Sequence, residues 1–168
     1  MFGHNDQYAD KRKKGNGTGT GENIFLKIEP GKPVKGTPQG EPYVFYSHWL
    51  GMGKGSAVCS GEFCPHCNSG QIPWMRIRTN FIQLVNGAFT AKIWEFSGMV
   101  DKSLAAIEAT LEKPLSDFTV SITRTGTGKK DTAYTIVPIS PLSEETKAML
   151  KTIKLLDLVP KAKSDDIA

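Results

Sequence analysis

The three cysteines of the chain lie close together, as Cys59, Cys64 and Cys67. Cys64 and Cys67 form a Cys-x-x-Cys pair, which brings two sulfur atoms to one metal ion at a small cost in loop entropy. His48 precedes them at the end of an apolar, strand-like run. Three thiolates and one imidazole complete the tetrahedral set of a structural Zn²⁺ site. The sequence therefore predicts a structural zinc ion bound by these four residues, with His66 as the competing fourth ligand.

Other uses of the cysteines fit the sequence less well. Complete disulfide pairing fails because three is an odd number, and the lack of a secretory signal favours a reducing compartment. A redox Cys-x-x-Cys pair belongs to a βαβ context, which is not apparent here. A deaminase-type catalytic zinc needs Glu at position 50 and Pro at position 63, where this chain has Leu50 and Phe63. We therefore expect a non-enzyme in the cytoplasm, or in the host-cell cytoplasm if the chain is viral.

Length and charge narrow the class of protein. A chain of 168 residues is expected to form one domain, and it is long enough to bury a hydrophobic core. The 17 glycines and 10 prolines indicate many turns. No apolar stretch approaches the length of a membrane span, so we expect no membrane partner. The net charge of +4 is compatible with a polyanionic partner such as nucleic acid.

The chain divides by composition. Residues 1–22 are expected to be a disordered arm, basic at Lys11–Lys14 and then rich in glycine. Two readings of the basic residues stay open: an arm that contacts phosphates or a neighbouring protein, and a solvated tail. Residues 23–140 are expected to form the main domain, with a zinc subdomain at about 48–70. A C-terminal helix is expected over 141–160 and a polar tail over 161–168.

The main domain reads as short strands. Strand-like runs cover about 24–28, 34–35, 42–49, 74–85, 89–96, 118–124 and 133–137. Asn86-Gly87 is the preferred pair for a two-residue hairpin turn. Leu104, Ile107 and Leu111 recur at helical spacing, which predicts a helix over about 100–110. This order predicts a mainly β fold, an OB-fold-like Greek-key barrel with an inserted zinc subdomain and one or two short helices.

Aromatic and basic residues are interleaved on the expected strands, and this favours binding of single-stranded nucleic acid. Such proteins combine a positive groove for phosphates with aromatic rings on which bases stack. Trp74, Arg76, Arg78 and Asn80 alternate onto one strand face, whereas Phe45, Phe81 and Phe118 are expected in the core. The full candidate set is Tyr43, Tyr46, Trp74, Arg76, Arg78, Lys92, Trp94, Arg124, Lys129, Lys130 and Tyr134.

The chain resembles the single-stranded DNA-binding, helix-destabilising proteins of T-even-type phages. The ligand order His48, Cys59, Cys64, Cys67 carries most of this resemblance, and the stretches 92–102 and 117–134 carry the rest. The resemblance implies an OB-fold core with these four residues as zinc ligands, and a groove lined by aromatic and basic residues. It also implies cooperative self-association through a basic N-terminal segment, for which Lys11–Lys14 is the counterpart here. The family's long acidic C-terminal domain is missing from this chain.

The leading hypothesis is a sequence-nonspecific single-stranded DNA (ssDNA) binding protein that coats and protects ssDNA in phage-type replication and recombination. Its expected partners are ssDNA, further copies of itself along the strand, and replication or recombination proteins. Two alternatives stay open. One is an RNA-binding OB module, since the same groove can read either nucleic acid. The other is a zinc-stabilised protein-interaction adaptor.

Overall fold

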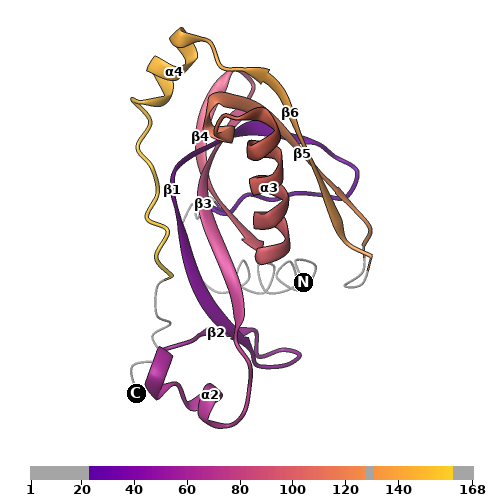
Figure 1. The fold of residues 1–168 in the computed structure, drawn as a ribbon, viewed down its shortest axis with the longest axis vertical. Helices are drawn as coiled ribbons and strands as arrows, with labels where there is room; N and C mark the ends of the chain where they lie inside the picture. The colour runs from indigo at the N-terminus through magenta and orange to yellow at the C-terminus, as the bar shows by residue number, and fades with distance from the viewer. Residues whose placement is uncertain (1–22, 128–130, 161–168) are drawn as a thin grey trace, which may run out of the picture.

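The computed structural model describes residues 23–127 and 131–160. Its strands are β1 (Val34–Trp49), β2 (Ser56–Val58), β3 (Trp74–Val85), β4 (Ala88–Ser97), β5 (Phe118–Thr125) and β6 (Ala133–Pro141). Its helical segments are η2 (Gly61–Phe63), α2 (Pro65–Asn68), α3 (Gly98–Leu111), η3 (Leu115–Asp117) and α4 (Glu144–Leu150). The strands form one antiparallel sheet in the order β4-β3-β1-β5-β6, with β2 paired to β1 (Figure 1). The prediction of a mainly β fold is confirmed.

Strand β1 holds the sheet together. It runs for 16 residues and pairs with β5 at Val34–Gly36, and with β3 along most of its length. At Gly36, which pairs with both neighbours, an added Cβ would lie 2.5 Å from the ring of Phe81, so a side chain does not fit. The register shifts between Gln39 and Tyr43, which marks a bulge. Beyond it, β1 and β3 carry the chain out to a small lobe that holds β2 and α2 (Figure 1).

The sheet does not close into the predicted barrel. Strands β4 and β6 end the strand order, and no pairing joins them within the described residues. The free edge of β4 instead pairs with the segment before β1: the Leu26 N–H donates to the Ile93 carbonyl, and the Ile93 N–H donates to the Ile24 carbonyl. This segment then reaches β5, where the Gly31 N–H donates to the Arg124 carbonyl. The expected strand over 24–28 is thus only an isolated β-bridge at Phe25. It occupies the edge of β4 with which β6 would have to pair to close a barrel.

The core lies between the sheet and helix α3. It is built from Val34, Ile77, Phe81, Trp94, Phe96, Leu115, Phe118, Val120 and Ile122. Helix α3 packs Val100, Leu104, Ile107 and Leu111 against it, which confirms the predicted helical spacing. Phe45 is also buried, on the other face of the sheet, so all three phenylalanines expected inside are inside. Among the described residues, no helix has the length and apolar character to cross a membrane.

The β3–β4 turn follows its sequence. Asn86 and Gly87 both have positive φ, 50° and 77°, between the directly paired Val85 and Ala88. Such a two-residue turn matches the twist of the flanking strands, which is why Asn-Gly is preferred there. The turn sets the register of the whole hairpin, and with it which side chains share a face.

The C-terminal helix is shorter than predicted. Ser143 caps α4, since its hydroxyl accepts the Thr146 N–H at 3.1 Å. The helix ends at Leu150, and residues 154–160 are neither helix nor strand. The prediction of a helix to residue 160 is wrong because Leu156 is bound elsewhere: both its N–H and its carbonyl bond to the side chain of Asn80. A backbone held in this way cannot also make helical bonds.

Trp94 is the largest side chain that was predicted to lie on the binding surface and is buried in the core instead. Its ring is 3% exposed and lies 4.5 Å from the Phe96 ring and 5.9 Å from the Phe81 ring, centroid to centroid. We expect Trp94→Ala to lower the free energy of unfolding by about 3–5 kcal/mol, as for other large-to-small core changes. Trp74→Ala, at an exposed position, should stay within about 0.5 kcal/mol of the parent. Urea denaturation measures both, and equal losses would contradict this description of the core.

Candidate functional site

Two strands and one short helix bring the metal-ligating residues together. His48 lies near the end of β1, opposite Ala57 of β2. Cys59 follows β2 directly, and its N–H donates to the Tyr46 carbonyl of β1 at 2.8 Å. Cys64 precedes α2, and Cys67 lies within that short helix. The pairing of β1 with β2 therefore fixes two ligands, and the turn of α2 fixes the other two.

The four side chains form a compact cluster that could hold a metal ion such as zinc. Their ligand atoms all lie within 4.8 Å of one another. His48 Nε2 is 3.3 Å from Cys67 Sγ and 3.5 Å from Cys64 Sγ, and Cys59 Sγ is 3.5 Å from Cys67 Sγ. Tetrahedral Zn²⁺ with ordinary bond lengths separates sulfur from sulfur by about 3.8 Å and sulfur from nitrogen by about 3.5 Å. The donor set and its spacing therefore fit the ion.

His48 is the histidine of the cluster. His66, the competitor within the Cys-x-x-Cys pair, is not among the clustered ligands, although its ring lies 5.4 Å from that of His48. His48 and Cys64 are both 1% exposed, so bulk water is excluded from this side of the cluster. His48 Nδ1 is buried without a hydrogen-bond partner in the described part of the chain. The ring is thus oriented by strand β1 and by packing, without an acceptor behind it.

The cluster favours one thiolate and opposes the others. Backbone hydrogen bonds, above all from Cys67, lower the pKa of Cys64 to about 5. The hydrogen bond with Cys59, followed by burial and the contact with Cys64, raises the pKa of Cys67 to about 11. A first thiolate is therefore stabilised on Cys64 while further thiolates are opposed. A divalent cation removes this opposition because it stabilises each thiolate that binds it.

A second feature of the site is a sheet face that combines aromatic rings with arginines. Direct strand partners point to the same side of a sheet, and Tyr43 pairs with Arg78, Phe45 with Arg76 and Ser47 with Trp74. On the other side of β3, Glu95 of β4 pairs with Arg78. We call this set the basic face: Tyr43, Phe45, Trp74, Arg76, Arg78 and Glu95. The prediction that Trp74, Arg76, Arg78 and Asn80 share a face is confirmed.

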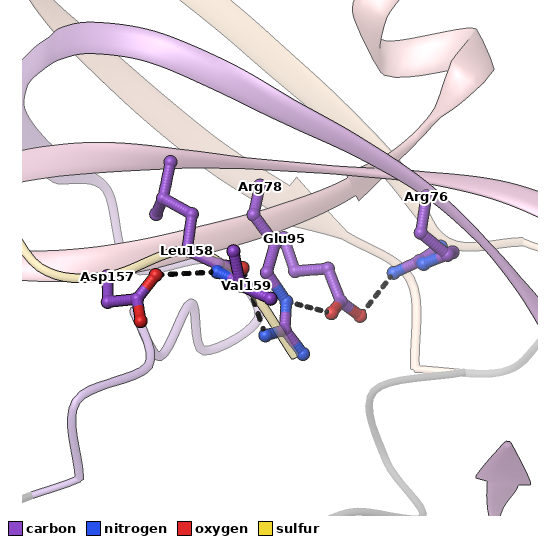
Figure 2. Close-up of polar contacts among 6 residues, drawn as sticks. All are labelled: Arg76, Arg78, Glu95, Asp157, Leu158 and Val159. Atoms are coloured by element: carbon purple, nitrogen blue, oxygen red, sulfur yellow. Dashed lines mark hydrogen bonds and ion pairs between the residues drawn. The ribbon is translucent and has the colours of Figure 1, made fainter. Parts of the chain in front are cut away.

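The arginines of the basic face are held in place. Arg78 Nε lies 2.8 Å and Arg76 Nη2 3.2 Å from the two carboxylate oxygens of Glu95 (Figure 2). The Arg78 guanidinium also lies 4.9 Å from the centroid of the Phe45 ring and 5.1 Å from that of Phe25. Glu95 is thus shared by two guanidinium groups, and the two rings keep Arg78 extended along the sheet.

Two exposed aromatic rings flank these arginines. Trp74 is 66% exposed and Tyr43 is 37% exposed. The Tyr43 ring stacks on the Phe45 ring with centroids 6.3 Å apart and an interplanar angle of 27°. Aromatic rings that stay exposed beside fixed arginines add little to core packing, but they suit flat ligands that carry negative charge.

The fold separates the remaining candidates from the basic face. Tyr46 pairs with Met75 and so lies on the opposite face of the ribbon. Lys92 pairs with Phe81, and its Nζ donates to the Asn23 carbonyl at 2.7 Å. Trp94 is in the core, so its predicted role in stacking is wrong. The alternation of β4 places Lys92 and Trp94 on one face of the sheet, but that face is the core side.

Arg124 and Tyr134 are paired across β5 and β6, two strands that carry none of the residues of the basic face. Arg124 is 8% exposed, and its Nε has no hydrogen-bond partner among the described residues. Burial raises the pKa of Tyr134, and the nearby Arg124 and Arg76 partly offset this rise. Lys129 and Lys130, and the basic residues Lys11–Lys14, lie outside the described residues.

Sequence reasoning missed Glu95 and Phe25 as neighbours of the arginines. Glu95 could have been found, because counting back along both strands from the two-residue Asn86-Gly87 turn places it opposite Arg78. Phe25 could not, because it reaches Arg78 from a separate segment of chain. The assembled site combines a cluster that could hold a metal ion with a sheet face that carries two arginines and exposed aromatic rings. No family model, curated protein or solved structure matches the chain.

Loss of one thiolate should empty the metal cluster. We expect wild-type protein to carry about one Zn²⁺ per chain and Cys64→Ser to carry much less, because a closed structural site needs all four ligands. Without the ion, the Cys59 N–H, bonded to the Tyr46 carbonyl, should exchange with solvent faster. Elemental analysis and hydrogen exchange measure these effects. His66→Ala is the matched control: equal zinc loss in both variants would contradict the four-ligand assignment.

Proposed function

We propose that this chain is a sequence-nonspecific ssDNA-binding protein, which coats and protects single strands in phage-type replication and recombination without catalysing a reaction. The observation that carries the proposal is the basic face, where Tyr43 and Trp74 are exposed beside Arg76 and Arg78. A single strand presents flat bases and a line of phosphates at once. Stacking is sequence-tolerant because every base has a π-face, and phosphate contacts carry no sequence information.

The strand order supports an OB-type domain. Strands β1, β3 and β4 are consecutive neighbours in the sheet, and β5 returns to lie beside β1, which is a Greek-key arrangement. Helix α3 connects β4 to β5. In OB folds, oligonucleotides bind to the face of the second and third strands and to the loops beside it. The corresponding strands here are β3 and β4, which carry Arg76, Arg78 and Glu95 of the basic face.

The metal lobe has a structural role in this proposal. Trp74 begins β3 and pairs with Ser47, which is the residue before His48. An ion held by His48 and the three cysteines ties this end of the ribbon to β2 and α2. Zn²⁺ would thus keep Trp74 in line with the arginines, and its binding energy would appear as folding energy of the lobe. Loss of the metal should weaken ssDNA binding indirectly.

Self-association along the strand and recruitment of replication or recombination proteins belong to the same proposal. Both come from the resemblance to the T-even-type helix-destabilising proteins, with Lys11–Lys14 as the self-association segment. The basic face supports neither of them directly, because it accounts for contact with one strand. An RNA strand offers the same bases and phosphates together with 2′-hydroxyl groups, so competition between DNA and RNA oligomers is the test of polymer preference.

A protein-interaction adaptor is the second candidate, and one observation favours it. The metal lobe exposes apolar side chains on and next to η2 and α2: Phe63 is 84% exposed and Ile72 is 83% exposed. Exposed apolar side chains of this size can belong to a protein interface. Under this alternative, changes to the basic face would leave nucleic-acid affinity unaltered.

The two exposed aromatic residues on opposite faces give a direct test of the proposal. Trp74→Ala should weaken binding to oligo(dT) roughly 5- to 150-fold, since stacking contributes about 1–3 kcal/mol per base. Tyr46→Ala removes a ring that is 49% exposed on the opposite face, and we expect little change. Fluorescence anisotropy with labelled oligo(dT) measures both. Equal effects of the two changes would show that the basic face is not where the strand binds.

A further inference from the structure

The extended segment after α4 lies on the sheet face proposed to bind ssDNA. We call residues 151–160 the strap. From α4 it runs beside β1 toward the metal lobe (Figure 1). The Arg78 Nη1 group donates to the Leu158 carbonyl at 3.4 Å, next to the ion pairs of Glu95 (Figure 2). At Gly40, an added Cβ would meet Leu155 Cδ1 at 2.8 Å, so the strap also touches the bulge of β1.

Asn80 is the main attachment point of the strap. Its Nδ2 donates to the Leu156 carbonyl at 3.0 Å, and its Oδ1 accepts the Leu156 N–H at 2.7 Å. Asn80 lies on β3 two residues after Arg78, so it belongs to the same sheet face, and it is only 3% exposed. One side-chain amide therefore holds both main-chain polar groups of one residue. A nucleobase edge presents a similar donor and acceptor pair to an Asn side chain.

The strap is held by contacts that can be exchanged. Its polar bonds to the sheet use main-chain groups of Leu156 and Leu158. The acidic side chain of the strap, Asp157, accepts the Val159 N–H, whereas Arg78 forms its ion pair with Glu95. Leu158 is buried, but Leu155 and Val159 remain exposed. Few buried apolar contacts, and no ion pair to the sheet among residues 23–127 and 131–160, are typical of segments that open locally.

We propose that the strap is an autoinhibitory segment, which ssDNA must displace from Asn80 and Arg78 before it can occupy the basic face. This inference rests on the proposed function. Displacement frees the Asn80 amide for a base and Arg78 Nη1 for a phosphate. The observed affinity is then reduced by the fraction of molecules in which the strap is closed. ssDNA and the strap are mutually exclusive ligands of one face.

The test uses the full-length chain and two proline substitutions. Leu156→Pro removes the N–H that Asn80 accepts, which weakens the attachment without changing the sheet. It should tighten binding to oligo(dT) by about 10-fold or more, because the open fraction rises. Lys154→Pro places the same residue in the strap where the structure assigns no hydrogen bond to the sheet, and it should bind as wild type does. Fluorescence anisotropy gives the three affinities.

Hydrogen exchange of the wild-type protein gives a second readout that needs no variant. The Leu156 amide should exchange slowly in the free protein and faster when oligo(dT) is saturating. The inference is overturned if wild type binds oligo(dT), Leu156→Pro binds no more tightly, and the Leu156 amide stays protected in the complex. If neither wild type nor Leu156→Pro binds oligo(dT), the proposed function itself fails.

Discussion

The fold depends on the close approach of β1 and β3 at Gly36. There β1 pairs with β3 on one side and β5 on the other, and the Phe81 ring fills the space that a side chain at position 36 would need. A core residue thus packs directly against the backbone of the strand that joins both halves of the sheet. Because β1 continues past this point to His48, its path also determines where the metal lobe lies relative to the core.

The metal cluster and the basic face are consequences of the same strand pair. The register between β1 and β3 places Tyr43, Phe45, Arg76 and Arg78 on one side, and the lobe at the end of the strands holds Trp74 in the same row. Glu95 spaces the two guanidinium groups, and aromatic rings fix the orientation of Arg78. The face is therefore ordered before any ligand arrives, which lowers the entropy cost of binding. In our proposal, the strap opposes ssDNA binding because it occupies the same face.

Local features were predictable from the sequence, and long-range ones were not. The ligands His48, Cys59, Cys64 and Cys67 follow from short spacings and the ligand preferences of zinc, and the β3–β4 register follows from the Asn86-Gly87 turn.

Alternation in β4 places Lys92, Trp94 and Phe96 on one face, but the sequence alone does not show that this face is the core, because that depends on where α3 packs. The helix expected over 141–160 ends early because Leu156 bonds to Asn80, which lies 76 positions before it.

The central claim is that the basic face binds single strands by stacking and charge. Titration of zinc-loaded protein with poly(dT), followed by tryptophan fluorescence in parallel with Trp74→Phe, tests it most directly, with duplex DNA of matched length as competitor. We expect strong quenching for wild type, much less for Trp74→Phe, poor competition by duplex, and binding that weakens steeply as salt rises. Equal affinity for duplex and single strand, or no binding even at low salt, would contradict the account.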